Sequence, residues 1–476
     1  MPKLQPIQHA FTGGEISPMM SARSDLEVYY TSTKQCRNMV PIVQGPVLAN
    51  PGTDYWKQVP GTSGRIIGFQ LNAATGFVVG ISDNGNIYVS DEAVGSLSRE
   101  LVTNSLFDAG TSGWNVTTGA EGIVVVTDGV LNLDTSIHPL NGWVQVDQLI
   151  TVSSPGEVHY VKVVPVDGSD TITCQLNVGI APNGTEYVEE TIGADTGVFE
   201  FTPTGDFYIT LYKPTGEEST KLITEVSSKY VQQASPGVGV SFEHPWTHDL
   251  DKIHWAMPPG ANAMYLTHPN FPVQRLSYDT DLEVWDFSAV SFVAPPATWT
   301  GEKYPRSLCF FGGRLWYGGP DENFYGSVSG SYEDFTIPAS DVVASDAVAF
   351  TMDKRGEIMW MIGLKNLLIG TTTGEHIVTS ESGVIYGGDI AVQQQSAYGS
   401  NYCQPIELGN KAAYVTGDGK RLNSIGYEWT AEQWVSDNLL HNSEHLTNGT
   451  QINQLLWAQN SYKIIMCRMA SGDIVT

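Results

Sequence analysis

The chain has 476 residues, of which 41% are hydrophobic and 16% are charged; this composition excludes an intrinsically disordered protein and predicts about two to four domains. Acidic residues outnumber basic ones by 51 to 24, for a net charge of −27, and a surface of this sign repels phosphate backbones and anionic lipids. Because no cluster of Lys and Arg is present either, the composition argues against a protein that grips nucleic acid.

No run of about 18 apolar residues occurs, so we expect no membrane span, and the first residues lack the apolar core of a secretory signal. The cysteines are scattered, and none forms a Cys-x-x-Cys pair: Cys36, Cys174, Cys309, Cys403 and Cys467. This pattern predicts reduced and mostly buried thiols in a protein made in a cytosol, with no disulfide framework and no cysteine zinc site. We expect no cofactor.

The N-terminal stretch FTGGEISPMMSARSDLEVYYTSTKQCRNMV, residues 11–40, is the most individual part of the sequence. Ser24 and Glu27 have the spacing of a capping box, which predicts one short N-terminal helix. Residues that would share one face of this helix are Leu26, Tyr29, Tyr30 and Thr33. The following segment, 41–52, is rich in Pro and Gly and predicts a hairpin.

The rest of the sequence is typical of β structure almost throughout. The 49 glycines and 25 prolines separate short runs rich in Val, Ile, Tyr, Phe, Thr and Trp. Hairpins are predicted over 76–91, around Asn84-Gly85, and over 308–320 and 366–380. Many short strands with frequent turns favour sandwiches or propellers, and the lack of a strict repeat makes any propeller irregular. A weaker helix is predicted around 430–445.

A change in the sequence pattern indicates that residues 101–232 are a domain inserted into the rest of the chain. Its sequence contains, in this order, Asn-x-Leu-Phe followed by Gly-Trp, a predicted strand ending in Thr-Val-Ser, and a predicted strand with Phe-Thr-Pro. This order of motifs resembles that of β-jelly-roll sandwiches found as carbohydrate-binding-like modules. We therefore predict three parts: a platform with the first propeller strands over 1–100, the insert over 101–232, and the remaining propeller and platform over 233–476.

Three aromatic residues of the insert are candidates for contact with a glycan or a partner: Trp114, Trp143 and Tyr187. Such side chains combine a flat apolar ring with a polar tip and are common at interfaces. The alternative is that both tryptophans belong to the core of the sandwich.

Two groups of histidines have some features of a metal site, but neither pattern is complete. HNSEH at 441–445 matches the His-x-x-Glu-His motif of a class of zinc peptidases, but no further His follows it to complete the ligand set. His244, His248 and His254 lie close in sequence, but their segment is typical of a strand entry with packing and turn hydrogen bonds. No nucleophile elbow, P-loop or dinucleotide fingerprint occurs either, so we predict that the protein is not an enzyme and has neither a catalytic nor a metal site.

The opening stretch resembles the N-terminal signature of the tail nozzle proteins of short-tailed bacteriophages (podoviruses), also called tail tubular protein B or stabilisation proteins. The matching positions are Phe11, Gly13, Gly14, Glu15, Ser17, Pro18, Arg23, Asp25, Leu26, Tyr29, Cys36, Asn38, Pro51, Gly52 and Thr53. Further blocks that look like this family are 246–276, 304–319, 325–335, 345–350, 358–378, 395–400 and 414–427. The resemblance covers roughly 1–100 and 233–476 and departs at the insert. Relatives usually continue beyond the last residues, so we expect a truncated C-terminal part.

The resemblance implies a structural component of a virion tail, made in the cytoplasm of the host bacterium. Such proteins form a homohexameric nozzle ring below the adaptor, or head-to-tail connector, that channels and gates genome DNA during ejection. Tail fibres or spikes attach near the ring, and the fold is an irregular β-propeller with a platform. The acidic composition would let DNA slide through the lumen without sequence-specific binding, because basic walls would hold its phosphates.

The same resemblance implies that the opening stretch contacts the adaptor or a neighbouring subunit. The residues assigned this role are Gly13, Gly14, Glu15, Ser17, Pro18, Arg23, Asp25 and Tyr29. The alternative function is a glycan-binding or glycan-hydrolysing β-propeller protein with a carbohydrate-binding-like insert. The two can be combined if the insert touches host cell-surface glycans from the outside of the ring.

Overall fold

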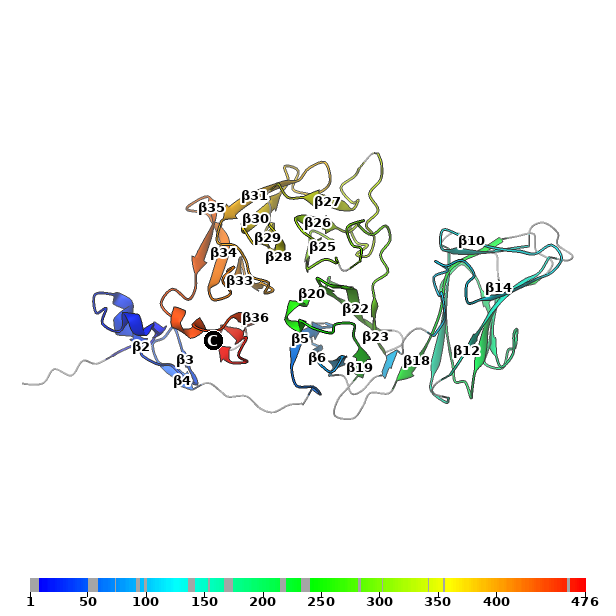
Figure 1. Cartoon of the computed structure of the whole chain (residues 1–476), viewed down its shortest axis with the longest axis horizontal. Helices are drawn as coiled ribbons and strands as arrows, with labels where there is room; N and C mark the ends of the chain where they lie inside the picture. The colour runs from blue at the N-terminus through cyan, green and yellow to red at the C-terminus, as the bar shows by residue number, and fades with distance from the viewer. Residues whose placement is uncertain are drawn as a thin grey trace, which may run out of the picture. The chain divides into compact units, whose positions relative to one another are not determined.

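The computed structural model describes residues 8–49, 59–72, 74–90, 95–97, 101–135, 142–152, 155–166, 174–214, 220–232, 240–280, 284–301, 303–340, 342–353, 356–459 and 463–476. In these ranges the chain consists of short strands and turns, and the only helical elements are short 3-10 helices (Figure 1). The prediction of an all-β protein is confirmed. None of the helices described is long and apolar enough to span a membrane.

The chain forms two compact units. The first comprises Met1–Ser90, Ser241–Ser277 and Phe287–Thr476, and the second comprises Asp91–Val240 and Tyr278–Asp286. The insert predicted over 101–232 lies within the second unit.

The first unit contains a succession of small antiparallel sheets (Figure 1). The first sheet is β5 (Gly64–Gln70), β6 (Gly76–Ser82), β7 (Asn86–Val89) and β19 (Val240–Glu243). It is followed by β20 (His254–Ala256), β21 (Ala263–His268), β22 (Phe271–Asp279) and β23 (Val284–Ala289), where the end of β22 and the start of β23 are counted with the second unit. Next come β24 (Ser307–Phe311), β25 (Arg314–Gly318), β26 (Asn323–Gly326) and β27 (Val348–Thr351), then β28 (Ile358–Gly363), β29 (Leu367–Thr371), β30 (Gly374–Thr379) and β31 (Ala391–Ser396). The last two are β32 (Ile406–Leu408), β33 (Lys411–Val415), β34 (Leu422–Glu428) and β35 (Gln433–Asn438), and β36 (Ile452–Ala458), β37 (Ile464–Met469) and β38 (Ile474–Val475).

The hairpins predicted from turn chemistry are confirmed. β6 pairs with β7 across Asn84-Gly85, and Gly85 has the positive φ of 88° that favours glycine. The predicted hairpins over 308–320 and 366–380 are β24 with β25 and β29 with β30. Near the N-terminus, β3 (Met39–Pro41) pairs with β4 (Val47–Ala49), while the end of the predicted hairpin, 50–52, lies outside the described residues.

From β20 onward, successive sheets of the first unit pack on one another through small apolar cores. Trp316 of β25 belongs to a core with residues of β28–β30, and Trp360 of β28 belongs to a core shared with β33–β35. Two glycines make room for these rings: a Cβ on Gly326 would lie 2.9 Å from Trp316, and one on Gly370 would lie 2.1 Å from Trp360. A succession of packed four-stranded sheets is the order of blades in a propeller; closure into an irregular propeller stays a prediction.

Polar contacts join the last sheet to the first part of this unit. The carboxylate of Asp251, in the 3-10 helix η3 (Leu250–Lys252), pairs with Arg468 and accepts a hydrogen bond of 2.9 Å from Asn453 Nδ2. Arg65 of β5 is 2% exposed and donates to the main-chain oxygen of Asp251 at 2.9 Å. Burial lowers the pKa of this guanidinium to about 10. A guanidinium that donates to carbonyl groups fixes the geometry of this contact.

The second unit is a jelly-roll-like sandwich of two sheets (Figure 1). Its five-stranded sheet has the order β15 (Val188–Ile192), β14 (Cys174–Gly179), β17 (Phe207–Lys213), β12 (Val144–Ile150) and β9 (Asn115–Thr118). The other contains β10 (Ile123–Thr127), β11 (Val130–Asp134), β18 (Thr220–Gln232), β13 (His159–Pro165) and β16 (Gly197–Phe201), with β8 (Gly95–Leu97) beside β18. Alternate residues of both sheets point inward and form one continuous core.

The short helix predicted near the N-terminus is present in 3-10 form, but its predicted cap is wrong. Two 3-10 helices, η1 (Pro18–Met20) and η2 (Glu27–Thr31), occupy this region. Ser24 does not cap: the residue before η2 is Leu26, and it makes no side-chain cap hydrogen bond. The cause is tertiary pairing, since β2 (Ser32–Thr33) follows at once and pairs in parallel with β1 (Gly14–Glu15), which leaves no room for a longer helix.

The weaker helix predicted around 430–445 is also wrong. This range holds strand β35 and the start of the 3-10 helix η4 (Glu444–Thr447). Trp434 is buried in a core with residues of the neighbouring strands, so the pairing of β35 with β34 overrides the local preference.

Candidate functional site

The Gly-Gly-Glu of the opening stretch forms a tight backbone contact. Gly13 N donates to Thr31 O at 2.8 Å, and a Cβ on Gly13 would lie 2.3 Å from the hydroxyl of Ser32. Gly14 has a φ of 65°, a region that glycine adopts without strain. These two glycines therefore allow β1 and β2 to lie against each other.

Glu15 ties this stretch to a loop near the end of the chain. Its Oε1 lies 2.9 Å from His445 Nε2, its Oε2 accepts from Cys36 N at 2.6 Å, and its main-chain oxygen accepts from the Ser443 hydroxyl at 2.6 Å. Ser17 N adds a bond to Asn442 O at 2.8 Å. Burial alone would raise the pKa of Glu15, but the hydrogen bonds from His445 and Cys36 lower it overall. We call these contacts the N-terminal clasp.

Other predicted assembly residues point to solvent. Arg23 and Asp25 form a two-pronged pair, with nitrogen–oxygen distances of 2.8 and 2.7 Å, and both are more than half exposed. The hydrogen bond between them raises the pKa of Arg23 and lowers that of Asp25. Pro18 begins η1 on the surface, and Tyr29 packs edge-on against Tyr30 at 5.5 Å. The predicted set thus divides into residues used inside the chain and residues free to meet another molecule.

The histidines named in the sequence analysis each contact a different group. His445 joins the clasp, His244 Nε2 lies 2.9 Å from Ser82 O, and buried His254 stacks on Tyr402 at 4.5 Å. His248 instead pairs with Asp249 at 3.2 Å. Within the described ranges, no three or more His, Cys, Asp or Glu side chains are arranged to hold a metal ion.

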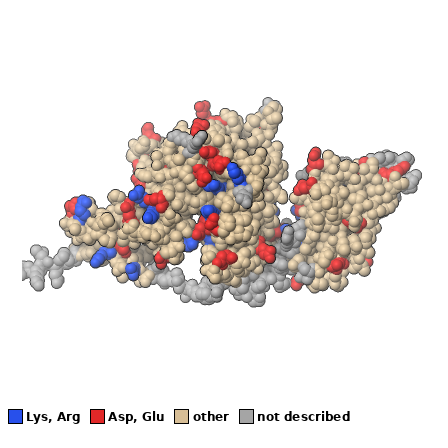
Figure 2. All heavy atoms as spheres, in the orientation of Figure 1, with Lys and Arg blue, Asp and Glu red and all other residues tan. Residues whose placement is uncertain are grey.

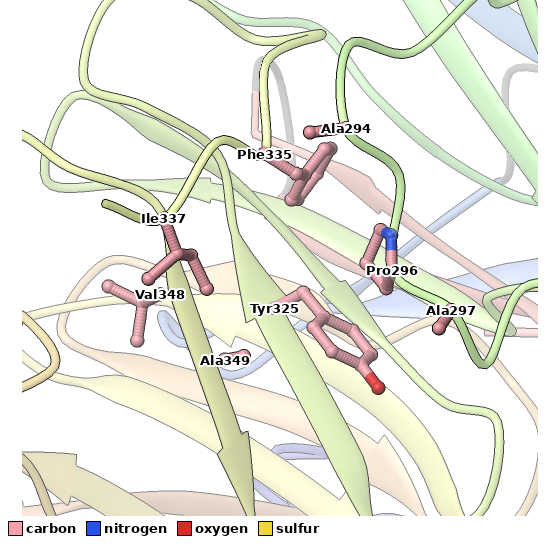
Figure 3. Close-up of a pocket in the computed structure, with 8 residues that line it drawn as sticks. All are labelled: Ala294, Pro296, Ala297, Tyr325, Phe335, Ile337, Val348 and Ala349. Atoms are coloured by element: carbon pink, nitrogen blue, oxygen red, sulfur yellow. The ribbon is translucent and has the colours of Figure 1, made fainter. Parts of the chain in front are cut away.

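On the face shown in Figure 2, the first unit has no dominant basic patch, and its basic side chains lie among acidic ones. A cavity of about 240 Å³ also lies in this unit (Figure 3). Its lining is apolar apart from one tyrosine: Ala294, Pro296, Ala297, Tyr325, Phe335, Ile337, Val348 and Ala349. The Tyr325 hydroxyl is hydrogen-bonded to Thr298 at 2.7 Å, so the cavity offers no acid–base pair for chemistry.

The three aromatic candidates of the sandwich differ in position. Trp114 is 6% exposed, packs on Phe107 at 5.6 Å and belongs to the core, so its ring offers no free face. Tyr187 is partly buried against the core, and its hydroxyl contacts Thr204 Oγ1 at 3.1 Å. Trp143 is partly exposed and, unlike the other two candidates, is not among the residues of the sandwich core or those packed against it.

Trp143 lies at the start of the outer face of the five-stranded sheet. Val144 and Val146 of β12 are buried in the core, so alternation places Trp143 and Gln145 on the opposite face. Tyr212 of β17 pairs with Gln145 in register, and its ring centroid lies 6.3 Å from that of Trp143. Sequence reasoning missed Tyr212, although the alternation in FYITLYK, with Phe207 and Leu211 inward, gives its direction.

Comparisons with known proteins concern a part of the chain. No protein-family model matches the sequence, and no curated protein matches it. Among solved structures, a family 4 carbohydrate-binding module ("CBM4 structure and function") is 19% identical over 28% of this chain and 99% of its own, with a TM-score of 0.21. TmCBM61, solved in complex with beta-1,4-galactotriose, is 15% identical over 31% and 100%, with a TM-score of 0.18. TmCBM27, a module studied for specific mannan recognition, is 14% identical over 29% and 99%, with a TM-score of 0.19. Likeness at this level says nothing of what this chain binds.

Proposed function

We propose that the second unit of this protein binds a carbohydrate chain on the outer face of its five-stranded sheet. The observation that carries the proposal is the pair of partly exposed rings, Trp143 and Tyr212, on a face that is not used by the core. Aromatic rings provide a flat apolar surface with little conformational entropy to lose, and the apolar faces of sugar rings stack on such surfaces. The role is binding, without turnover.

The test is affinity gel electrophoresis of the whole chain in gels that contain soluble polysaccharides. Trp143→Ala should lower the association constant at least tenfold for a polysaccharide that retards the wild-type protein. Trp429→Ala is the matched control, because this tryptophan is 74% exposed in the first unit and should leave binding unchanged. Equal binding by the Trp143→Ala variant would refute the proposal, as would a wild-type protein that binds no polysaccharide.

We also propose that the first unit is a subunit of the nozzle ring in a short-tailed bacteriophage tail. The support is the resemblance of the sequence blocks, which fall on strands of the successive sheets: 304–319 on β24 and β25, 358–378 on β28, β29 and β30, and 414–427 on β33 and β34. The exposed Arg23–Asp25 pair favours this role, since it is available to an adaptor or a neighbouring copy. The two proposals are compatible, because a glycan-binding unit on a tail would meet the host surface.

Electron microscopy of the purified protein, or of a tail that contains it, tests the nozzle proposal. End-on views should show a ring of six copies with a central channel, because heterologous contacts that close under rotation form rings. The nozzle would be ruled out if the purified protein stays monomeric at high concentration and a tail that contains it shows no channel. The glycan proposal would then still stand.

A further inference from the structure

Asp147 is a buried carboxylate on the outer side of the five-stranded sheet. It is 3% exposed, and its oxygens accept hydrogen bonds from Gln145 Nε2 at 2.9 Å and from Asn115 Nδ2 at 3.2 Å. Both donors are neutral amides, and no Lys or Arg in the described part of the chain forms an ion pair with Asp147. Burying a carboxylate without a neighbouring cation costs free energy of folding. The outer face of this sheet does not need a charge to fold, so the presence of Asp147 calls for another explanation.

The strand register surrounds Asp147 with further polar groups. Thr210 of β17 lies directly opposite Asp147, and Asn177 of β14 lies opposite Thr210. Asn177 Nδ2 donates to Asn183 Oδ1 at 2.5 Å, while its Oδ1 is buried without a hydrogen-bond partner. A line of acceptors and hydroxyls therefore crosses the sheet beside the Trp143 and Tyr212 rings.

A fixed loop covers one end of this line. Asn183, with a φ of 61°, donates its main-chain N–H to Thr210 Oγ1 at 3.0 Å, and the Glu186 carboxylate accepts from Ile180 N at 3.1 Å. Thr210 is fully buried beneath this loop. The exposed part of the face therefore runs from the two rings past Gln145 and Gln175, with Asp147 nearly buried at its floor beside Gln145, and the loop marks its boundary.

The charge of this face selects among ligands. Among the described residues of its strands, the outward side chains include Asp147 and Glu189 but no Lys or Arg, whereas the lysine of β17, Lys213, is fully buried on the opposite side. Carboxylate- or sulfate-bearing sugars would meet only like charge here. Hydroxyl groups of a neutral sugar, in contrast, can donate to the free lone pairs of the carboxylate.

We propose that Asp147, held in place by Gln145 and Asn115, is the polar anchor of this site and that its ligand is a neutral polysaccharide. Sugar rings stack on Trp143 and Tyr212 while neighbouring hydroxyls donate to the carboxylate. This inference rests on the proposed glycan binding and adds the anchoring residue and the class of ligand.

The experiment compares wild type, Asp147→Asn and Asp195→Asn in gels that contain galactan, glucomannan, hydroxyethylcellulose or anionic polygalacturonate. Asp195 is exposed in a loop of the same unit, so its variant removes the same charge away from the face. Asp147→Asn should lower the association constant for the retarding neutral polymer at least tenfold, while Asp195→Asn should match the wild type. Polygalacturonate should retard none of the three proteins.

The outcomes separate the two proposals. A wild type that binds a neutral polymer together with an equally strong Asp147→Asn variant overturns the anchor role and leaves glycan binding intact. Preference for polygalacturonate overturns the neutral class, and a wild type that binds nothing overturns glycan binding itself. If Asp147→Asn lowers the melting temperature, Gln145→Ala is used in its place, because this half-exposed residue orients the carboxylate. Gln145→Ala should weaken binding severalfold without lowering the melting temperature. Unchanged binding by this variant would contradict the proposal.

Discussion

The two units bury their apolar residues in different ways. The sandwich has one continuous core between two sheets, with Leu211 of β17 and Val163 of β13 among its members. The first unit divides its core into small clusters between successive sheets, and polar contacts such as Asp251 with Arg468 join its last sheet to its first part. Strands of one sandwich share a single core, whereas stacked sheets depend on nearest neighbours. Two units with similar strand content are therefore expected to differ in the cooperativity of their unfolding.

The largest test of this comparison removes one large side chain from each unit. Trp360→Ala leaves a cavity between two sheets of the first unit, where the ring is fully buried, and should cost ~3–5 kcal/mol of that unit's stability. Leu211→Ala should cost ~2–5 kcal/mol in the sandwich. Urea unfolding followed by hydrogen-exchange mass spectrometry assigns each loss to a unit. A loss shared by both units in either variant would show that they unfold together.

Acid should destabilise the first unit more than the sandwich. Burial lowers the pKa of His268 to about 4 and that of His254 well below its usual value. Both stay neutral in the folded chain and take up a proton near pH 6.5 when unfolded, so stability is full above about 6.5 and falls by about 1.4 kcal/mol per pH unit for each group toward its folded pKa. Urea midpoints at pH 7, 6 and 5 measure the slope.

The control for the acid effect is His268→Gln, which removes one titrating group and should reduce the slope of the first unit. The sandwich contains His159, whose pKa burial also lowers, and it should show the smaller slope. Equal slopes for both units would contradict the prediction.

Glu15→Gln should loosen the N-terminal clasp without unfolding the sheets. The variant keeps a hydrogen-bond acceptor but loses the charge, so the expected cost is about 1 kcal/mol, confined to residues 8–49. Since the pKa of Glu15 is lowered, the charge contributes stability above about pH 4.3 that is lost as the pH falls further. Faster amide exchange in 8–49 is the readout, and protection equal to wild type would contradict the role of the carboxylate.

The smallest effect on stability is expected at the Arg23–Asp25 pair. Both side chains are exposed, and pairs of this kind contribute little to folding. Arg23→Glu should leave the melting temperature unchanged but disturb ring assembly in electron microscopy. Lys303→Glu reverses the charge of an exposed basic residue elsewhere in the first unit and serves as the control. A variant that assembles normally would remove Arg23 from the proposed contact.

Local signals in the sequence predicted local structure well. The turn at Asn84-Gly85 and the glycine-containing hairpins carry their conformation in a few neighbouring residues, and all form as predicted. The capping-box pattern at Ser24 failed because the pairing of β1 with β2 sets the geometry there, and that pairing depends on residues far apart. Asp147 was missed for the same reason: its polar neighbours come from separate strands, and only the register between β12, β17 and β14 brings them together.

The N-terminal clasp also has a consequence for synthesis. Glu15 and His445 are 430 residues apart in the sequence, so at about 5–20 residues per second the ribosome needs ~20–90 s between them. The sandwich strands are complete long before that. The second unit can therefore fold while the chain is still being made. In contrast, β1 and β2 cannot form the clasp until the loop with Ser443 and His445 has been synthesised. During that interval the nascent first unit exposes its start to chaperones and to other copies of itself.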